Sequence, residues 1–339
     1  MVKNLVIKLL FTLFTGMVLL TNSIYGQTPP NVVISIKPIH SLISFLMQGI
    51  KEPQVIVDGF LSEHEYYLKP SDIRKLEQAQ IIVWMGNTID PFMYSYIKNA
   101  RHTQIIIKVQ DIPGLSLFSL RQGGVWDQHD HCQEDDHHAD HAEEIDRHEL
   151  GENHHKTCVY DDEVQETIDG HLWLDPQNAK IIATYISNQL VVIDPKNQSV
   201  YARNLDKLKS RLDAIDQAIS KNLASYQGKP ILVAHDAYQY FEKRYRLSVI
   251  GSVTLTPGEA LSIKRLHDIL DKISAYPQIC IFQEPQFNNQ KLATILSTPK
   301  TNVKIGMLDP IGANIDTGPE LYFSLLGNIT QAIIDCWHH

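Results

Sequence analysis

VVISIKPIHSLISFLMQ, residues 32–48, changes its hydrophobic period part-way along. Val32–Ile36 is a short, mainly apolar and β-branched run, which is typical of a strand buried on both faces. Ile39–Gln48 instead has apolar residues at helical spacing. A buried strand followed at once by a helix is the repeating unit of proteins in which helices cover a parallel sheet.

The same alternation continues through both halves of the chain. In the first half we expect further strands at 54–57, 81–85 and 104–109, a helix capped by Ser71-Asp72 that runs to residue 79, and a helix at 91–100. In the second half we expect strands at 231–234, 247–253, 278–282 and 303–308, and helices at 237–245, 262–276, 288–296 and 320–337. The sequence therefore predicts an α/β protein of two lobes, each with a mostly parallel sheet flanked by helices.

Two helices are predicted between the lobes, at 176–192 and from about Pro195 to Tyr226. Roughly 30 residues rising 1.5 Å each would span about 45 Å, so the second helix is either a long rigid connector or part of one lobe. We divide the chain into an N-terminal lobe (27–175), connecting helices (176–228) and a C-terminal lobe (229–339), because about 310 residues suit two domains.

The first 26 residues have the pattern of a secretory signal peptide. Lys3 and Lys8 precede an apolar run, Leu9–Leu20, which ends in small and polar residues. We predict export, with cleavage between Gly26 and Gln27. A membrane anchor is the alternative, but a spanning helix needs roughly 20 apolar residues and this run is shorter.

The acidity of the chain is confined to one segment. The formal net charge is −9, and residues 127–155 alone hold 11 acids and one Arg, a charge of −10. The remainder is therefore close to neutral, and nothing indicates a nucleic-acid partner.

Residues 127–156 also carry eight histidines and almost no aliphatic side chains. Such a segment cannot bury enough apolar surface to order itself, so we predict a loop inserted in the N-terminal lobe. Two interpretations stay open: an arm that collects metal, or a solvated acidic tract with no metal role. The accessory ligands would be His129, His131, His137, His138, His141, His148, His154 and His155.

Four cysteines are present, and none belongs to a CxxC pair. Cys280 lies in an apolar strand-like run and Cys336 in the last helix, and after export we expect these two to form a disulfide. Cys132 and Cys158 flank the acidic segment, and whether they pair is left open.

Three histidines stand in informative places. His64 lies beyond the strand at 54–57, and His235 directly follows the strand at 231–234. Ligand groups collect beyond the carboxyl ends of strands in open α/β sheets, so these two would face one site from opposite lobes. His171 precedes the first connecting helix. The spacing alone leaves open whether the three meet.

If they meet, the chemistry favours zinc. Three neutral imidazoles suit Zn²⁺ in tetrahedral geometry, with Glu63 or water as the fourth ligand, whereas manganese prefers more carboxylate oxygen. Three other histidines are interpreted as ordinary core or surface residues: His40, His102 and His267.

Five motifs, in this order, resemble the periplasmic zinc-binding component of the high-affinity zinc uptake ABC transporter (ZnuA type), within the metal-binding cluster of solute-binding proteins. They are Ser62-Glu63-His64-Glu65-Tyr66 with Lys69-Pro70-Ser71-Asp72, His171-Leu172-Trp173-Leu174, His235-Asp236-Ala237-Tyr238-Gln239-Tyr240-Phe241, Glu284-Pro285-Gln286-Phe287, and Leu308-Asp309-Pro310-Ile311-Gly312. They extend over about 250 residues, and the acidic segment falls between the first two ligand motifs, as in that family. Each motif is moderately specific, and the ordered set is strongly so.

This resemblance implies zinc ligands at His64, His171 and His235, with Glu63 as an optional fourth. In manganese-binding relatives a carboxylate stands where this chain has His235, so the histidine favours zinc. An Asp ligand of those relatives occupies a position resembling Asp309, which makes Asp309 a candidate ligand or support.

The resemblance further implies a C-clamp of two lobes joined by a rigid helix, a periplasmic location and a membrane permease as partner. It also implies a disulfide that matches Cys280–Cys336. Cys132 and Cys158 are additions to the usual pattern.

The sequence thus predicts a non-enzymatic, monomeric receptor that captures Zn²⁺ between two lobes for an ABC permease. A receptor for manganese or another divalent metal, or an adhesin of the same fold, is the alternative. A zinc hydrolase is disfavoured because no HExxH helix is present and a ligated Glu63 would close the open metal position. A histidine-rich zinc store would rely on the acidic segment and need no site between the lobes.

Overall fold

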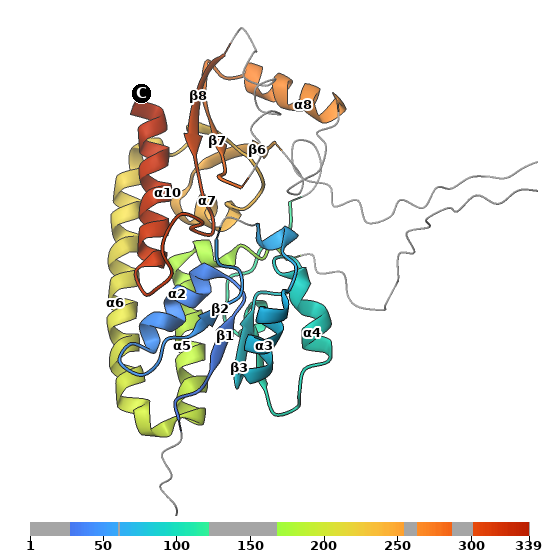
Figure 1. Cartoon of the computed structure of the whole chain (residues 1–339). Helices are drawn as coiled ribbons and strands as arrows, with labels where there is room; N and C mark the ends of the chain where they lie inside the picture. The colour runs from blue at the N-terminus through green and yellow to red at the C-terminus, as the bar shows by residue number, and fades with distance from the viewer. Residues whose placement is uncertain (1–27, 60–61, 122–167, 254–262, 287–300, 339) are drawn as a thin grey trace, which may run out of the picture.

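The computed structural model describes residues 28–59, 62–121, 168–253, 263–286 and 301–338. It contains two four-stranded parallel sheets, one from each half of the chain (Figure 1). Three sets of predictions lie outside the described residues: the signal peptide, the segment 127–156 with Cys132 and Cys158, and the helix at 288–296.

The first sheet has the strand order β2-β1-β3-β4. Its strands are β1 (Val32–Ile34), β2 (Gln54–Val55), β3 (Ile81–Trp84) and β4 (Ile105–Lys108), and its helices are α2 (Lys37–Leu46), α3 (Pro70–Gln78) and α4 (Tyr94–Lys98). Along β3, Ile81 and Val83 pack into one hydrophobic cluster while Ile82 and Trp84 pack into another. The strand is therefore buried on both faces, as its unbroken apolar run predicts.

The second sheet repeats this arrangement with the order β6-β5-β7-β8. Its strands are β5 (Pro230–Val233), β6 (Ser248–Ser252), β7 (Gln278–Gln283) and β8 (Asn302–Met307), and its helices are α7 (Gln239–Tyr245), α8 (Ile263–Ser274) and α10 (Leu321–His338). In each sheet the first strand is internal, and the chain passes to one side of it and then to the other. This reversal creates a switch point at the carboxyl ends of β1 and β3, and of β5 and β7, where ligand groups gather.

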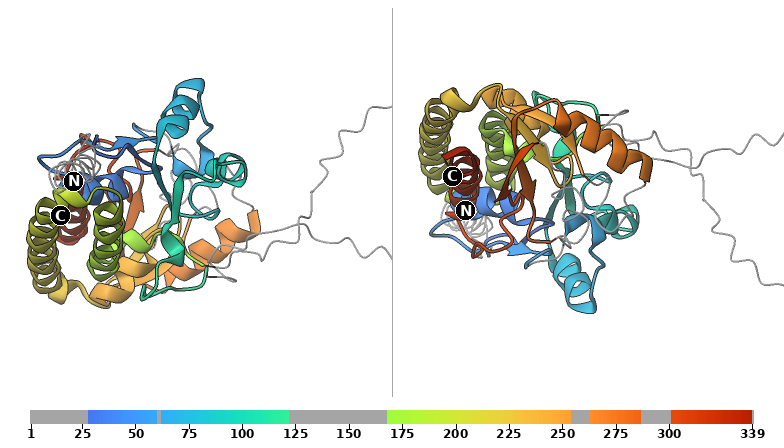
Figure 2. Two further views of the ribbon diagram at one scale, coloured as in Figure 1. Left: turned by 90° about the horizontal axis from the view of Figure 1, so that it is seen from below. Right: turned by 90° about the horizontal axis from the view of Figure 1, so that it is seen from above.

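Two long helices lie between the sheets in the chain, α5 (Pro176–Ile193) and α6 (Gln198–Leu223). Short 3-10 turns, Pro195–Asn197 and Ala224–Tyr226, flank α6. Helix α6 contacts α2 from the first half and α10 and α7 from the second, and it lies beside α10 along the side of the molecule away from α8 (Figures 1 and 2). The long joining helix is thereby confirmed, because it packs on both halves rather than on one.

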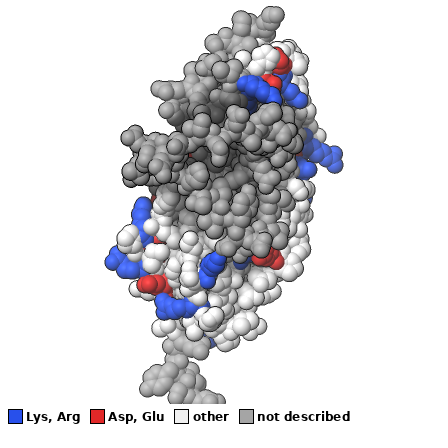
Figure 3. Space-filling model, turned by 90° about the vertical axis from the view of Figure 1, so that its right-hand side faces the viewer, with Lys and Arg blue, Asp and Glu red and all other residues white. Residues whose placement is uncertain are grey.

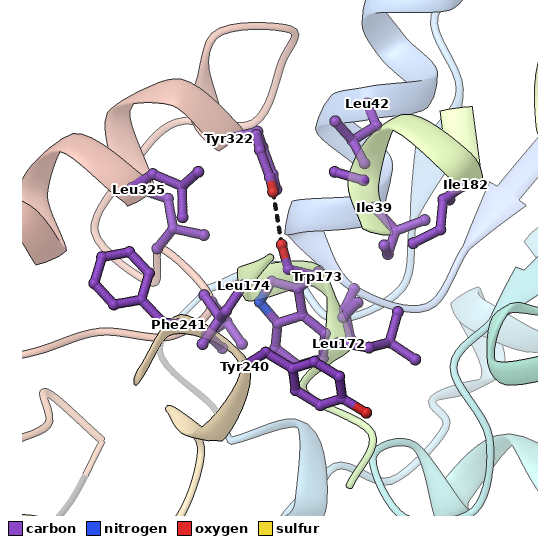
Figure 4. Packing of buried hydrophobic residues seen from close by; sticks show 14 of the residues in the cluster. Ile39, Leu42, Leu172, Trp173, Leu174, Ile182, Tyr240, Phe241, Tyr322 and Leu325 are labelled. Atoms are coloured by element: carbon purple, nitrogen blue, oxygen red, sulfur yellow. Dashed lines mark hydrogen bonds between the residues drawn. The ribbon is translucent and has the colours of Figure 1, made fainter. Parts of the chain in front are cut away.

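The hydrophobic core is continuous between the halves. One cluster includes residues of α2, α5, α6, β5, β7 and α10. Near its centre Trp173 is fully buried, and its indole N–H donates to the carbonyl of Pro310 at 2.8 Å. Tyr322 donates in turn to the carbonyl of Trp173 at 2.6 Å (Figure 4). Because buried polar groups find partners across the lobes, the two sheets are held in one frame.

Lys37 adds a second tie between the halves. It is buried at the start of α2, and its ammonium donates to the carbonyls of Ala313 and Ile315 in the second half. Burial lowers the pKa of Lys37, while nearby carboxylates including Asp58 oppose that shift.

The expected disulfide is present. Cys280 in β7 is bonded to Cys336 in α10, with the Cα atoms 6.1 Å apart. The bond fastens a central strand of the second sheet to the C-terminal helix. Among the described helices, none combines the length and apolar content needed to cross a membrane.

Candidate metal centre

His64 lies in a 3-10 turn, Glu63–Glu65, that follows β2. Ser62 Oγ accepts a hydrogen bond from the backbone N–H of His64 at 3.3 Å and so caps the turn. His64 is partly exposed, and its side chain is 14% accessible. It thus forms the solvent-facing side of the site.

The turn is fastened to α3 by a carboxylate. Asp72 Oδ2 accepts from the Tyr66 hydroxyl at 2.8 Å and from the backbone N–H of Lys69 at 3.0 Å. Of the predicted Ser71-Asp72 cap, Asp72 does supply a capping oxygen, but from the third helical position. Ser71 lies inside the helix, since α3 begins at Pro70 with Lys69 as its N-cap. Burial and the Asp72 carboxylate raise the pKa of Tyr66 to about 12.

His171 immediately precedes the 3-10 turn Leu172–Leu174 and helix α5. Asp175 caps α5 by accepting from the backbone N–H of Gln177 at 2.9 Å. Gly170 packs closely under the loop after β3, where an added Cβ would lie 2.4 Å from Ile89. A larger residue at 170 would therefore collide with the side chains of Ile89 and Thr88, and either these or the backbone beside His171 would have to shift.

His235 stands beyond the carboxyl end of β5, and Glu284 directly follows β7, its neighbour in the sheet. His235 and Glu284 are both buried. The switch point of the second sheet thus supplies a histidine and a carboxylate side by side.

The structure brings His64, His171, His235 and Glu63 together. One potential ligand atom from each lies within 4.8 Å of all the others. The three imidazole ring centroids are 5.3–5.8 Å apart. Sequence spacing left this convergence open, and the fold supplies it from both halves of the chain.

Two of the imidazoles are oriented by carboxylates. His171 Nδ1 lies 2.8 Å from Asp169 Oδ1, and His235 Nδ1 lies 2.7 Å from Glu284 Oε1. A carboxylate at Nδ1 accepts its proton and leaves the lone pair on Nε2, which is the form that binds a metal.

The two Nε2 atoms then face each other at 3.4 Å. With both lone pairs turned inward, this contact has no proton to share. Two nitrogens bound to one tetrahedral Zn²⁺, each at about 2.05 Å, would be about 3.3 Å apart. The observed separation therefore suits a zinc ion held between them.

Glu63 completes the group with oxygen. Its side chain is buried, and Oε1 has no hydrogen-bond partner among the described residues. Burial raises the pKa of Glu63, and nearby His171 and His235 act in the opposite direction. A buried acceptor without a partner is unfavourable, and a cation at this point would satisfy it.

Asp309 lies outside this four-residue group. Its Oδ1 accepts from the backbone N–H groups of Ile311 and Gly312, at 3.1 and 2.9 Å, and its Oδ2 accepts from Ala313 at 2.6 Å. Both oxygens therefore shape the loop after β8. Its role as a ligand or support of the metal stays a prediction.

Sequence reasoning assigned no role to Asp169 or Glu284. Asp169 lies two residues before His171, and that spacing was a usable local signal. Glu284 heads one of the quoted motifs at the end of a predicted strand, but its contact with His235 depends on the pairing of β5 with β7. Of the other histidines, His40 is buried with Nε2 at 3.1 Å from the Pro53 carbonyl, whereas His102 and His267 are exposed.

A family model described as zinc-uptake complex component A, periplasmic, matches residues 32–336. The chain belongs to this family. The high-affinity zinc uptake system protein ZnuA of Brucella abortus (strain 2308) is 36% identical over 310 residues, which cover 90% of this chain and 91% of that protein.

Solved structures share the fold at lower identity. A ZnuA deletion mutant with zinc bound is 20% identical, covers 91% of this chain and 97% of its own, and superposes with a TM-score of 0.67. The solute-binding protein FpvC from Pseudomonas aeruginosa in complex with Mn²⁺ is 18% identical, covers 91% of this chain and 99% of its own, and also gives 0.67. The fold is thus common to family members and to proteins solved with different metals.

Proposed function

We propose that this protein is a periplasmic receptor that captures Zn²⁺ between its two lobes and delivers it to the membrane permease of an ABC transporter. The observation that supports this most is the meeting of three imidazoles and one buried carboxylate between the sheets. The zinc ion is the cargo, and the membership of the chain in a zinc-uptake family agrees with that role.

The ligands in this proposal are His64, His171, His235 and Glu63. Three nitrogens and one oxygen match the tetrahedral preference of zinc, while manganese favours sites richer in oxygen. A receptor for manganese or another divalent metal is the second candidate, since a relative of this fold was solved with Mn²⁺. The three-imidazole set argues for zinc over that candidate.

The same ligand set supports binding rather than catalysis. Catalytic zinc sites keep one position for water or substrate, and four protein ligands would fill all positions of a tetrahedral ion. Because Glu63 is the only carboxylate of the four, its departure would leave three imidazoles and loosen the ion. Release to the permease therefore needs only a local change, which suits lobes joined by α6 and by buried hydrogen bonds.

We further propose that residues 1–26 are a signal peptide, cleaved before Gln27, and that the mature protein is a monomer. Its parts would be the N-terminal lobe (27–175), the connecting helices (176–228) and the C-terminal lobe (229–339).

The histidines of residues 127–156 would be weaker, accessory zinc ligands. On the face shown in Figure 3, the described Lys and Arg residues lie in the lower part and at the upper right, with a few Asp and Glu residues beside them. The sequence places the acidity of the chain in the segment, because residues 127–155 hold a formal charge of −10 against −9 for the whole chain, with imidazoles and carboxylates intermixed. Isothermal titration of full-length protein and a 127–156 deletion checks this: unchanged zinc stoichiometry in the deletion would remove the segment from zinc binding.

A titration that follows Trp173 fluorescence tests the main proposal. The indole ring centroid lies 5.3 Å from that of His171, so zinc at one equivalent should change the emission. The change should be lost in Trp173→Phe and should need far more Mn²⁺ than Zn²⁺. A flat titration with zinc in the wild-type protein, or saturation by manganese first, would reject zinc as the cargo.

A further inference from the structure

The two chain ends that flank residues 122–167 meet beside the metal centre. Ser119 and Ile168 form an antiparallel bridge, and the backbone N–H of Asp169 donates to the Phe118 carbonyl at 2.9 Å. We call residues 118–121 and 168–171 the stem. Its last residue is His171, so a metal ligand is part of the stem.

Gln239, the first residue of α7, joins the stem to the ligand. Its side chain is buried, and Nε2 donates to the Ser119 carbonyl at 3.0 Å and to Asp169 Oδ2 at 3.1 Å. The other oxygen, Asp169 Oδ1, accepts from the backbone N–H and from Nδ1 of His171, at 3.0 and 2.8 Å. One amide group therefore fixes both the position of the stem and the rotation of the carboxylate that orients His171.

Further hydrogen bonds of Tyr240 and Arg121 fasten the stem to the same segment of the second half. The Tyr240 hydroxyl donates to the Asp169 carbonyl at 2.7 Å and accepts from the backbone N–H of Phe118 at 3.1 Å. Arg121 makes two hydrogen bonds to the carboxylate of Asp236, the residue after His235. It also donates to Glu242 at 2.5 Å. The carboxylates raise the pKa of Arg121 although its burial opposes this, so the guanidinium stays charged.

From this geometry we propose that Gln239 is a positioning residue for zinc binding, through which the stem of the 122–167 segment sets the affinity of the site. The inference rests on the proposed zinc-binding function. Both N–H groups of the amide are used, one for the Ser119 carbonyl in the first strand of the stem and one for Asp169 in the second. A displacement of residues 118–121 relative to residues 168–171 would therefore carry Gln239 away from Asp169 and leave the His171 ring less firmly oriented. Loss of such outer partners of a metal ligand usually weakens binding by about 10-fold to 100-fold.

The test compares Gln239→Met with Gln177→Met in the full-length protein. Gln177 also donates to a carboxylate, that of Asp216 in α6 at 2.9 Å, and neither residue belongs to the proposed metal group. With Zn²⁺ and a competing chelator at one equivalent, Gln239→Met should bind about 10-fold more weakly and Gln177→Met as wild type does. Co²⁺ should give altered absorption bands only in Gln239→Met, because a change in ligand geometry, unlike general destabilisation, alters the spectrum.

Two further sets of variants test whether Gln239 acts through Asp169 and whether Arg121 contributes to the same effect on zinc binding. If Gln239 acts through Asp169, adding Gln239→Met to Asp169→Asn should weaken binding little further. Arg121→Gln should weaken zinc binding several-fold, while Arg244→Gln, which removes a comparable pair with Asp216, should not. Arg121 is partly exposed, so this variant also serves if Gln239→Met fails to fold.

The outcomes separate the two proposals. A wild-type protein without tight zinc binding would overturn the proposed function itself. Tight binding in the wild type together with unchanged affinity and unchanged Co²⁺ spectra in Gln239→Met and Arg121→Gln would overturn only the role of the stem.

Discussion

His171 and His235 each place Nδ1 beside a carboxylate, but the two carboxylates lie at very different separations along the chain. Asp169 is two residues from its histidine, whereas Glu284 is 49 residues from its own. The first pair is built by one local turn. The second exists only because β5 and β7 pair in register, so its geometry depends on the whole second sheet.

The two sides also differ in what holds them. The His171 side is fastened by contacts across the lobes, such as the bond from Trp173 to Pro310. The His235 side shares such a contact through Arg121 and Asp236, and it is fastened in addition within its own lobe, where the Cys280–Cys336 disulfide ties β7 to α10. The two histidines have the same kind of partner but are held by different parts of the structure. Substitutions in those parts should therefore affect one histidine more than the other.

The largest effect is expected from removal of a ligand on either side. Four ligands share an apparent zinc-binding free energy of about 10–16 kcal/mol, so His171→Ala and His235→Ala should each weaken binding by roughly 100-fold to 1000-fold. Chelator competition measures this, and His102→Ala is the exposed control. Wild-type affinity in either variant would remove that histidine from the site and break the equivalence of the two sides.

Loss of the disulfide should act on the His235 side. For a loop of 56 residues, Cys280→Ser with Cys336→Ser should lower the free energy of unfolding by about 4 kcal/mol, as measured by urea denaturation without metal. The remaining folded protein should bind zinc more weakly because Glu284 loses its anchored strand. Unchanged affinity would show that strand pairing alone positions Glu284.

Neutralising Asp169 and Glu284 in turn compares the His171 side with the His235 side most directly. Asp169→Asn and Glu284→Gln should each weaken zinc binding by about 10-fold to 100-fold, because the amide no longer fixes the tautomer of the histidine. Asp194→Asn, a buried aspartate that accepts from Tyr201 at 3.0 Å, is the control that should alter stability alone. If Glu284→Gln binds zinc as tightly as the control does, Glu284 is dispensable and only Asp169 orients a ligand.

The smallest effect is expected on the stability of the metal-free protein and comes from Glu63, which lies near both His171 and His235. Burial raises its pKa in the folded protein, so the folded state binds a proton more readily than the unfolded state. Its contribution therefore favours folding at low pH and is lost as the pH rises from the ordinary value of about 4.5 through the raised pKa.

Glu63→Gln should therefore stabilise the metal-free protein at pH 7, by about 1–3 kcal/mol, and yet weaken zinc binding. Thermal melts between pH 4 and pH 8 measure the first effect, and chelator competition measures the second. A metal-free variant that is less stable than wild type at pH 7 would contradict the unfavourable burial of Glu63.

The sequence determined the fold class and most of the elements. Local patterns predict strands with unbroken apolar runs, such as Val32–Ile34, and helices with apolar residues at a 3.6-residue period. They do so because burial on one or both faces of an element dictates which of its positions are apolar. Asp72 takes part in the cap of α3 as predicted, but the helix begins at Pro70, before Ser71 and Asp72, because the Asp72 carboxylate reaches back from the third helical position. The local pair Asp169 and His171 was also within reach of sequence reasoning.

Only the tertiary structure decided that His64, His171 and His235 meet and that Glu63 places a buried carboxylate oxygen beside them. It also decided that Glu284 and Gln239 help to orient the imidazoles. These contacts join segments up to 172 residues apart, from Glu63 to His235. Local propensities say nothing about such distances. They are set by the parallel order of two sheets whose carboxyl ends supply the ligands, and by a continuous core that fixes one sheet against the other.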